Sequence, residues 1–376
     1  MPVVNGAESS AASRRVTVIG LGNIGAAVIP HVARMSMVAR VTVIDPDDYE
    51  ETNLWSQDIL PCEVGRPKAV VQARRLRRIN PSIQAQAIVD GVENVPLGML
   101  RSDVILGCLH SKAPRRVVNQ AAWRLGIPWV DAGVNAADGL LARVTVYVPG
   151  DDVPCLECAW DSGDYERLQL LHPCGGGRAE VAPTNATSSL GALAAALQAI
   201  ECRKLLVGDW DHVAAGRQVM IDAQSHVQCV TSLRRRAGCR FDHETWRIGT
   251  AEVNPSDITL DQVLERASRR LGGGPVRVGL EGRPFVRQLQ CVACGKARAT
   301  LRLADRLRPK EATCAECGGR TVPVGFETTD WIGRHAVDRR FLRWPLSRIG
   351  VQRGDVLTFR GASGRVTHEE IGVDRL

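Results

Sequence analysis

Four cysteines in the last third of the chain have the spacing of a metal site. Cys291 and Cys294 form one Cys-x2-Cys pair, Cys314 and Cys317 form another, and a glycine follows each pair. Two such pairs supply four thiolates to a tetrahedral zinc ion, and the glycines ease the tight turns around it. The spacing predicts a closed structural zinc ribbon, with a redox dithiol as the alternative.

A third Cys-x2-Cys pair, Cys155 and Cys158, is half of such a site. Because a structural zinc ion takes four protein ligands, this pair requires two more from elsewhere in the chain. The remaining cysteines at 62, 108 and 202 lie among apolar neighbours, which favours a packing role for them. Paired thiols of this kind are typical of zinc binding, rather than disulfides, in a reducing compartment.

A glycine-rich turn near the start of the chain has the composition of a phosphate site. In the stretch VTVIGLGNIG, Gly20, Gly22 and Gly25 follow an apolar run and precede a helical pattern. Such a turn brings backbone N–H groups and a helix N-terminus close to the phosphates of a nucleotide. Asp45 ends the next apolar run, where a carboxylate suits a hydrogen bond to a ribose hydroxyl. These residues alone fit NAD, FAD or ATP.

The elements that must position these residues alternate in type along the first half of the chain. Apolar runs typical of strands occur at 14–22, 39–47, 84–92, 102–110 and 127–134, mostly with helical patterns between them. This order predicts a doubly wound, Rossmann-like α/β fold with a mostly parallel sheet that is covered on both faces. The alternating stretch 139–150 predicts an antiparallel extension, and a long helix is expected at 187–208.

Changes in pattern divide the chain into parts. Residues 1–14 are expected to be a flexible N-terminus, and 15–250 a nucleotide-binding domain with a crossover loop at 159–183. Residues 251–330 predict a helix and a small C-terminal zinc-ribbon module. Residues 331–376 predict a small C-terminal extension. Its Trp331, Trp344 and Phe359 favour a small packed module that could dock a partner.

Three short motifs that follow Asp45 resemble those of a known family. They are Thr52-Asn53-Leu54-Trp55-Ser56-Gln57, then Gly65-Arg66-Pro67-Lys68-Ala69, then Asn80-Pro81. With the glycine turn and the later stretches VPCLECAW and HPCGGG, this series resembles the ThiF/MoeB superfamily of adenylating enzymes, whose fold is shared with ubiquitin-activating enzymes. The resemblance covers about residues 15–245. It implies ATP-dependent adenylation of the C-terminal carboxylate of a small ubiquitin-like or sulfur-carrier protein, and a homodimer.

The resemblance assigns roles in an ATP and Mg²⁺ site. A carboxylate is a poor electrophile, so joining it to AMP requires positive charge and hydrogen-bond donors around a pyrophosphate leaving group. Two positions differ from the family: Ser56 replaces an Arg, and His110 replaces a metal-binding Asp in the nucleotide site. The assigned residues are Gly20, Gly22 and Gly25 as the phosphate cradle, Asp45 and Asp47 for the ribose, Lys68 as the phosphate cation, and Asn53 and Gln57 as neutral donors.

The family pattern also bears on three cysteines. Cys174, in HPCGGG, lies where some members carry a cysteine that accepts the activated acyl group, and an inert loop cysteine is the alternative. Members close the first zinc site with a pair after the long helix, and the corresponding stretch AGCRFDHETW provides Cys239 and His243. Cys229 is the competing ligand for this site.

Two other functions remain open at this point. A catalytically degenerate relative would bind a nucleotide or a carrier as a scaffold. An NAD-dependent oxidoreductase would use the same glycine turn, but this hypothesis leaves Lys68 and the zinc pairs unexplained.

The composition limits the kinds of molecule that the protein is expected to bind. The net charge of +7 comes mostly from arginine-rich runs, and aromatic residues make up only 4% of the chain. Since aromatics do not interleave with the basic runs, we expect no nucleic-acid binding; the runs suit a solvated face or a docking surface for an acidic protein. No apolar run reaches the roughly 18 residues of a membrane span. We therefore expect no membrane segment, no signal peptide and a cytoplasmic protein.

Overall fold

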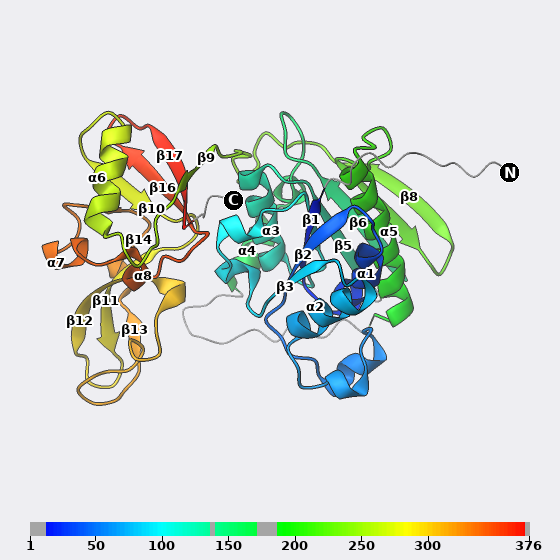
Figure 1. Cartoon of the computed structure of the whole chain (residues 1–376), viewed down its shortest axis with the longest axis horizontal. Helices are drawn as coiled ribbons and strands as arrows, with labels where there is room; N and C mark the ends of the chain where they lie inside the picture. Colours follow the sequence, from blue (N-terminus) through cyan, green and yellow to red (C-terminus); the bar gives the residue numbers. More distant parts are fainter. Residues whose placement is uncertain (1–12, 136–139, 171–185, 373–376) are drawn as a thin grey trace. The chain divides into compact units, whose positions relative to one another are not determined.

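The computed structural model describes residues 13–135, 140–170 and 186–372. They form two compact units, each with a hydrophobic core of its own (Figure 1). The first unit comprises Met1–Val95 and Leu100–Trp246, and the second comprises Pro96–Met99 and Arg247–Leu376. Within the described ranges, no helix combines the length and the apolar composition needed to cross a membrane.

An eight-stranded sheet forms the centre of the first unit, in the order β3-β2-β1-β4-β5-β6-β7-β8. Its strands are β1 (Arg14–Ile19), β2 (Val38–Ile44), β3 (Gln84–Ile88), β4 (Val104–Gly107), β5 (Trp129–Asn135), β6 (Leu141–Tyr147), β7 (Arg217–Asp222) and β8 (Val227–Ser232). The first five in this order are parallel, and β6, β7 and β8 continue the sheet with antiparallel pairings. The prediction of a doubly wound, mostly parallel sheet with an antiparallel extension is confirmed.

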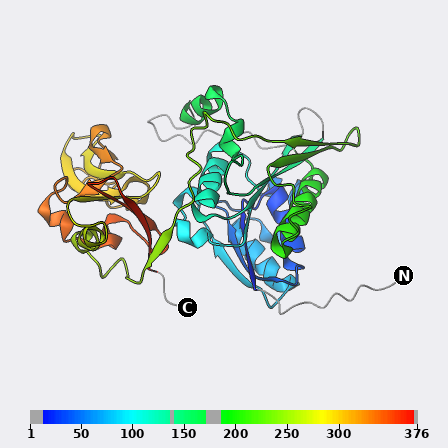
Figure 2. The same ribbon diagram turned by 90° about the horizontal axis from the view of Figure 1, so that it is seen from above.

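Helices cover both faces of this sheet (Figure 2). Side-chain alternation along β5 separates the faces, because Val130 and Ala132 point into the core while Asp131 points to the opposite side. There Asp131 meets Arg115 of α3 (Lys112–Leu125). The helices that share the core with Val130 are α1 (Asn23–Ala33), α2 (Lys68–Ile79) and α5 (Ser188–Val207).

The long helix predicted at 187–208 is α5. The Thr187 side chain accepts a hydrogen bond from the Leu190 N–H, and Gly208 ends the helix in the left-handed conformation, with φ of 75°. The start of α5 lies close to the start of α1, where Asn23 donates to the Ala186 carbonyl at 3.0 Å. A Cβ atom at Gly191 would lie 1.7 Å from Asn23 Oδ1, so a larger residue there would displace the Asn23 side chain.

The chain is helical at the start of the segment where the sequence predicted a crossover loop at 159–183. A 3-10 helix, η5 (Leu156–Ala159), is followed by α4 (Ser162–Leu170). Asp161 Oδ1 accepts from the Asp164 N–H at 2.9 Å, and Asp164 Oδ2 accepts from the Asp161 N–H at 3.2 Å. This reciprocal cap starts α4. Residues 171–185 lie outside the described residues.

The second unit contains two sheets, one in the order β15-β10-β16-β17-β9 and one in the order β12-β11-β13 with β14 beside β11. β9 pairs in parallel with β17, so the first and last strands of the unit are neighbours. The strands are β9 (Ile248–Ala251), β10 (Val276–Gly279), β11 (Phe285–Cys291), β12 (Ala297–Leu303), β13 (Thr321–Pro323), β14 (Thr328–Thr329), β15 (Ile332–Gly333), β16 (Val356–Gly361) and β17 (Val366–Ile371). The helices are α6 (Leu260–Arg270), α7 (Arg339–Leu342) and α8 (Leu346–Ile349).

Residues beyond 331 share one core with the residues before them. Leu264 of α6, Phe285 of β11 and Phe359 of β16 are all buried in the same cluster. The C-terminal segment therefore supplies β15, β16, β17, α7 and α8 to a core that α6 and β10 begin.

Candidate nucleotide site and metal centres

The glycine turn joins β1 to α1 at the carboxyl edge of the parallel sheet, beside the point where the strand order reverses. Gly20 has φ of 86°, and a Cβ atom there would lie 2.6 Å from the Cys108 carbonyl oxygen. A Cβ atom at Gly25 would lie 1.9 Å from the Gly20 carbonyl oxygen. Neither position therefore accepts a side chain without moving backbone.

Gly22 caps the N-terminus of α1 without a side-chain hydrogen bond, which leaves the first N–H groups of the helix available to a ligand. A Cβ atom at Gly22 would have Gln57 Nε2 as its nearest side-chain neighbour, at 3.9 Å. The amide of Gln57 thus lies directly beside the turn. Its Oε1 is buried and has no hydrogen-bond partner in the described part of the chain. This half-buried amide therefore has an unused acceptor beside the turn, which a hydrogen-bond donor of a ligand would satisfy.

Asp45 is buried behind the turn and orders it. One carboxylate oxygen accepts from the Leu21 N–H at 2.6 Å, and the other accepts from the Asp47 N–H at 2.9 Å. Burial raises the pKa of the Asp45 carboxyl, while the charge of Lys68 and the two backbone N–H groups oppose this rise. Each carboxylate oxygen retains further acceptor capacity, so the predicted hydrogen bond to a ribose hydroxyl is compatible with these contacts.

Lys68 begins α2 and points back toward the residues after β2. Its Nζ lies 3.2 Å from Asp47 Oδ2 and 5.8 Å from the centre of the Tyr49 ring. Its backbone N–H donates to the Asp47 carbonyl oxygen at 2.9 Å. The Lys68 side chain is only 11% exposed, whereas Asp47 is 52% exposed. The structure thus brings Asp45, Asp47 and Lys68 together beside the glycine turn.

Asn53 and Gln57 are carried by a 3-10 helix, η1 (Glu51–Trp55), and the residues that follow it. Asn53 Oδ1 accepts from the Glu50 N–H at 3.0 Å, which caps η1. The Gln57 N–H donates to the Asn53 carbonyl oxygen at 2.8 Å. Asn53 therefore has its side-chain oxygen engaged locally, while Gln57 reaches the turn.

The remaining predicted residues of the nucleotide site are less closely gathered. His110 is exposed, three residues after the end of β4, and Ser56 is half-buried at the end of η1. Mg²⁺ prefers oxygen ligands. In the described ranges, the groups of three or more side chains able to ligate a metal are two cysteine-containing sets. Neither set contains a residue of the predicted nucleotide site. Cys174 lies outside the described residues.

Two buried residues that support the turn were missed from the sequence. The Tyr49 hydroxyl donates to the Leu21 carbonyl oxygen at 2.9 Å and accepts from Gln72 Nε2 at 2.7 Å. Tyr49 is 1% exposed and Gln72 is fully buried. Burial also raises the pKa of Tyr49, so its hydroxyl stays protonated and remains a donor. The only signal in the sequence is an aromatic residue inside the acidic run DPDDYEE.

Two arginines and a buried aspartate on the other face of the sheet were also missed. Arg115 Nε lies 3.0 Å from Asp131 Oδ1, and Arg143 of β6 lies 3.7 Å from Asp131 Oδ2. The two guanidinium groups also lie close to Gly133. A Cβ atom there would be 3.1 Å from Arg115 and 3.0 Å from Arg143. A charged residue within the apolar stretch IPWVDAGV was the available signal. A fully buried carboxylate requires such partners, which explains their convergence.

The first metal centre gathers four residues from two distant segments. Cys155 and Cys158 lie at η5, and Cys239 and His243 lie after β8; their ligand atoms are within 4.8 Å of one another. The Cys155 sulfur lies 3.8 Å from those of Cys158 and Cys239. Four ligands at about 2.3 Å from a zinc ion would place sulfurs at about this separation. Cys229 is exposed on β8 and is not part of the group.

Contacts around this centre hold the segment that carries Cys239 and His243 in place. Arg124 of α3 makes two hydrogen bonds to Asp242, at 2.6 and 2.8 Å, between the two ligands Cys239 and His243. The His243 ring packs edge-on against Trp123, with centroids 4.9 Å apart. A hydrogen bond from Cys155 lowers the pKa of the Cys158 thiol to about 4, which favours the thiolate that a metal binds.

The second metal centre consists of Cys291, Cys294, Cys314 and Cys317, again with ligand atoms within 4.8 Å of one another. Cys291 lies at the end of β11, and its sulfur is 3.5 Å from that of Cys317. Backbone N–H groups, that of Cys294 above all, lower the pKa of Cys291 to about 6. The four sulfurs fit a closed tetrahedral zinc site with no open position for a substrate.

Known proteins resemble the first two-thirds of the chain. A family model described as the ThiF family matches residues 4–240. The sulfur carrier protein ThiS adenylyltransferase of Escherichia coli is 29% identical over 60% of this chain and 84% of that protein. The SAMP-activating enzyme E1 of Haloferax volcanii is 30% identical over 56% of this chain and 73% of that protein. The crystal structure of E. coli MccB with succinimide has a TM-score of 0.50 at 24% identity, over 61% of this chain and 67% of that chain, which is a likeness of fold.

Proposed function

The chain belongs to the ThiF family, and we propose that it uses ATP to adenylate the C-terminal carboxylate of a small ubiquitin-like or sulfur-carrier protein. One observation supports this most directly. Lys68 lies against Asp47 beside a glycine turn that accepts no side chains at Gly20 and Gly25. A cation and a side-chain-free turn at the same sheet edge are what a triphosphate requires.

The chemistry divides between these groups. A carboxylate oxygen of the carrier attacks the α-phosphorus of ATP, a new P–O bond forms, and the bond to pyrophosphate breaks. The N–H groups of the turn and of the start of α1 bind phosphate oxygens, and Lys68 offsets the charge that builds on the leaving pyrophosphate. Gln57 donates its amide N–H groups beside Gly22, and Asp45 holds the ribose. Asn53 acts by shaping η1, which presents Gln57.

Magnesium accompanies ATP in reactions of this class and neutralises phosphate charge. His110 is an exposed imidazole where the family has a carboxylate, and hard Mg²⁺ favours carboxylate oxygen over imidazole nitrogen. The proposal therefore assigns no described residue as its ligand.

Cys174 is the proposed acceptor of the activated acyl group. Its thiolate attacks the acyl carbon of the adenylate, a C–S bond forms, and the bond to AMP breaks. The proposal rests on its place in HPCGGG, since Cys174 lies outside the described residues. Cys174→Ala is expected to retain ATP–pyrophosphate exchange and to lose a thiol-sensitive adduct with the carrier. An adduct that persists in the variant would identify Cys174 as an inert loop residue.

Both cysteine-containing sets are proposed to hold structural zinc, because each offers four ligands and no open position. None of the eleven cysteines in the described ranges forms a disulfide bond. Thiols in this number suit a reducing compartment, so we place the enzyme in the cytoplasm.

A homodimer is proposed, with β8 as one contact region. β8 is the last strand of the eight-stranded sheet, and all six of its residues are exposed. Val227 and Val230 are 57% and 54% exposed there. An apolar edge strand can pair with its own copy across a two-fold axis, since such an interface uses the same patch twice. Light scattering tests this, and a monomer at micromolar concentration would contradict it.

Calorimetric titration of the zinc-loaded protein with Mg-ATP, and separately with NAD⁺, tests the proposed nucleotide. We expect binding of ATP, followed by ATP–pyrophosphate exchange in the presence of a carrier. Binding of NAD⁺ alone would favour the oxidoreductase hypothesis. Binding of neither nucleotide would favour a scaffold in which Ser56 and His110 mark a lost activity.

A further inference from the structure

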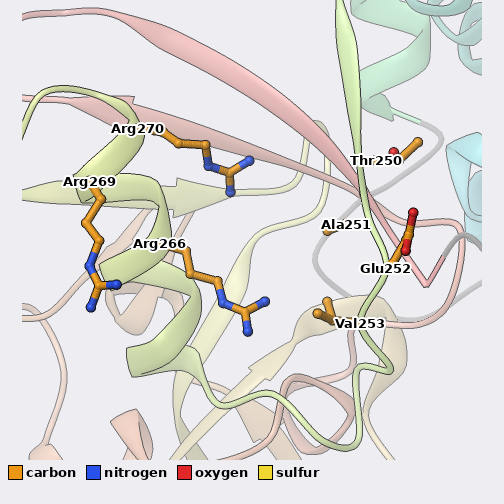
Figure 3. A pocket seen from close by; sticks show the side chains of 7 residues that line it. All are labelled: Thr250, Ala251, Glu252, Val253, Arg266, Arg269 and Arg270. Atoms are coloured by element: carbon orange, nitrogen blue, oxygen red, sulfur yellow. The ribbon is translucent and has the colours of Figure 1, made fainter.

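A basic pocket lies in the second unit, between β9 and α6 (Figure 3). Its volume is about 570 Å³. Neither the glycine turn nor either cysteine-containing set contributes to it. One wall is formed by Thr250, Ala251, Glu252 and Val253, and the other by three arginines of α6, Arg266, Arg269 and Arg270.

The three arginines differ in how their charge is balanced. Arg270 pairs with Glu369 of β17, whose side chain is almost fully buried, and Arg269 pairs with Glu265 one turn earlier on α6. Arg266 is exposed and has no ion-pair partner among the described residues. One positive charge of the pocket is therefore left without a counterion from the described part of the chain.

Arg266 and Arg270 repel each other. They are four positions apart on α6, which places both on one face of the helix, where like charges destabilise it. Burial, and then the charge of Arg266, lower the pKa of the Arg270 guanidinium. Both guanidinium groups extend toward β9 in Figure 3, whereas that of Arg269 lies farther from β9. An anion between Arg266 and Arg270 would relieve this repulsion and accept hydrogen bonds from both.

The form of the pocket indicates the size of its occupant. All three arginines are exposed, so an occupant would lie on a surface rather than inside an enclosed cavity, which is unlike a site for a small metabolite. Ala251 and Val253 are partly buried apolar residues on the opposite wall. They offer contact to the methylene groups of a side chain such as glutamate.

We propose that this pocket docks an acidic segment of a protein partner, with carboxylates of that segment bridging Arg266 and Arg270. The inference goes beyond adenylation and does not depend on it, because no residue of the nucleotide site takes part. A protein segment fits better than free phosphate because Ala251 and Val253, on a wall that also carries Glu252, add apolar contacts to the guanidinium groups of Arg266 and Arg270.

A labelled peptide of about six glutamates, titrated into the full chain by fluorescence polarisation at low salt, tests the proposal. Arg266→Gln is expected to weaken binding about three- to tenfold, since it removes one of two charged hydrogen-bonding groups. Arg365→Gln is the matched control, because it removes an equal charge from an exposed position of the second unit that does not line the pocket, and binding should stay within about twofold. Arg266 is exposed, so both variants are expected to fold.

Three outcomes would overturn the proposal. If the glutamate peptide does not bind the native chain, the pocket is not a docking site for acidic segments. Equal losses in Arg266→Gln and Arg365→Gln would show a general attraction to a basic surface. Displacement of the peptide by inorganic phosphate, added at the same total negative charge as the peptide, would identify a phosphate site instead. A glutamine peptide of the same length is the negative control, and it should not bind.

Discussion

The Tyr49 hydroxyl donates a hydrogen bond of 2.9 Å to the Leu21 carbonyl, and so joins the segment after β2 to the middle of the glycine turn. The same hydroxyl accepts from Gln72 on α2. Leu21 is thus held on both sides, since its N–H donates to Asp45. The shape of the nucleotide turn depends on this small buried network as well as on glycine.

Tyr49→Phe removes a donor from the Leu21 carbonyl and an acceptor from Gln72. We expect the free energy of unfolding to fall by about 1–3 kcal/mol, because the groups left behind are buried and unpaired. Tyr147→Phe is the control: its ring stacks on Trp129 at 5.0 Å, and its hydroxyl has no hydrogen bond within the described residues. Urea denaturation measures both, and equal losses would contradict the role given to Tyr49.

Gly25→Ala places a methyl group against the backbone of the turn, 1.9 Å from the Gly20 carbonyl oxygen. We expect a loss of about 1–3 kcal/mol in the free energy of unfolding and loss of ATP binding. Gly22→Ala should leave stability within about 0.5 kcal/mol, because its Cβ atom has no neighbour closer than 3.9 Å. Thermal unfolding measures the stability of both variants, and titration with ATP measures their nucleotide binding. Similar stability for both variants would count against the steric argument.

Lys68→Ala removes the cation beside Asp47. We expect ATP–pyrophosphate exchange to fall by about 10²-fold or more, the usual effect of removing one group that stabilises developing charge. Arg74→Ala changes an exposed cation on the same helix and should leave the rate unchanged. An active Lys68→Ala enzyme would place the phosphate site elsewhere.

Zinc analysis of the purified chain should give two ions per chain, one for each cysteine-containing set. Cys239→Ser and Cys294→Ser should each lower the content to about one, because sulfur ligands dominate both sites. Cys229→Ser should retain both ions, since Cys229 is exposed on β8 outside the group. A loss of zinc in Cys229→Ser would mean that the first centre uses a different fourth ligand.

Acid should weaken the start of α4 through Asp164. The hydrogen bond from Lys112, with help from Arg167, lowers the pKa of Asp164 to about 2, below the 3.8 of an ordinary aspartate. Its stabilisation is therefore present above about pH 4 and is lost as the pH falls through 2. Because both partners are well exposed, we expect Asp164→Asn to cost only about 1 kcal/mol at neutral pH and nothing once the pH is well below 2. A difference that does not depend on pH would contradict the ion-pair origin.

Local patterns in the sequence predicted much of the first unit. The alternation of apolar runs and helical patterns indicated the parallel sheet, and the helix expected at 187–208 is α5. The pairing of Cys239 and His243 with the earlier cysteines could be anticipated only by resemblance. Those residues lie in a turn in which His243 has φ of 62°, which no periodicity reveals.

Features that depend on contacts between distant segments were not predictable from such patterns. The polar bonds of Tyr49 and Gln72, and the ion pairs of Asp131, arise where separate elements meet. The sequence did not predict α4, although Asp161 is a good N-cap residue, because the apolar periodicity of Ser162–Leu170 is weak. The segment after 331 lacked a familiar motif, yet it supplies strands to the core of the second unit.

The parallel pairing of β9 with β17 has a consequence for how the second unit is made. Its sheet is not complete until residues up to Ile371 have left the ribosome, because β17 must reach back to pair with β9. The first unit has no such dependence, as its strands end before residue 233. Synthesis should therefore yield a folded first unit while the second is still open, and the neighbouring ends of the second unit make it a natural candidate for circular permutation.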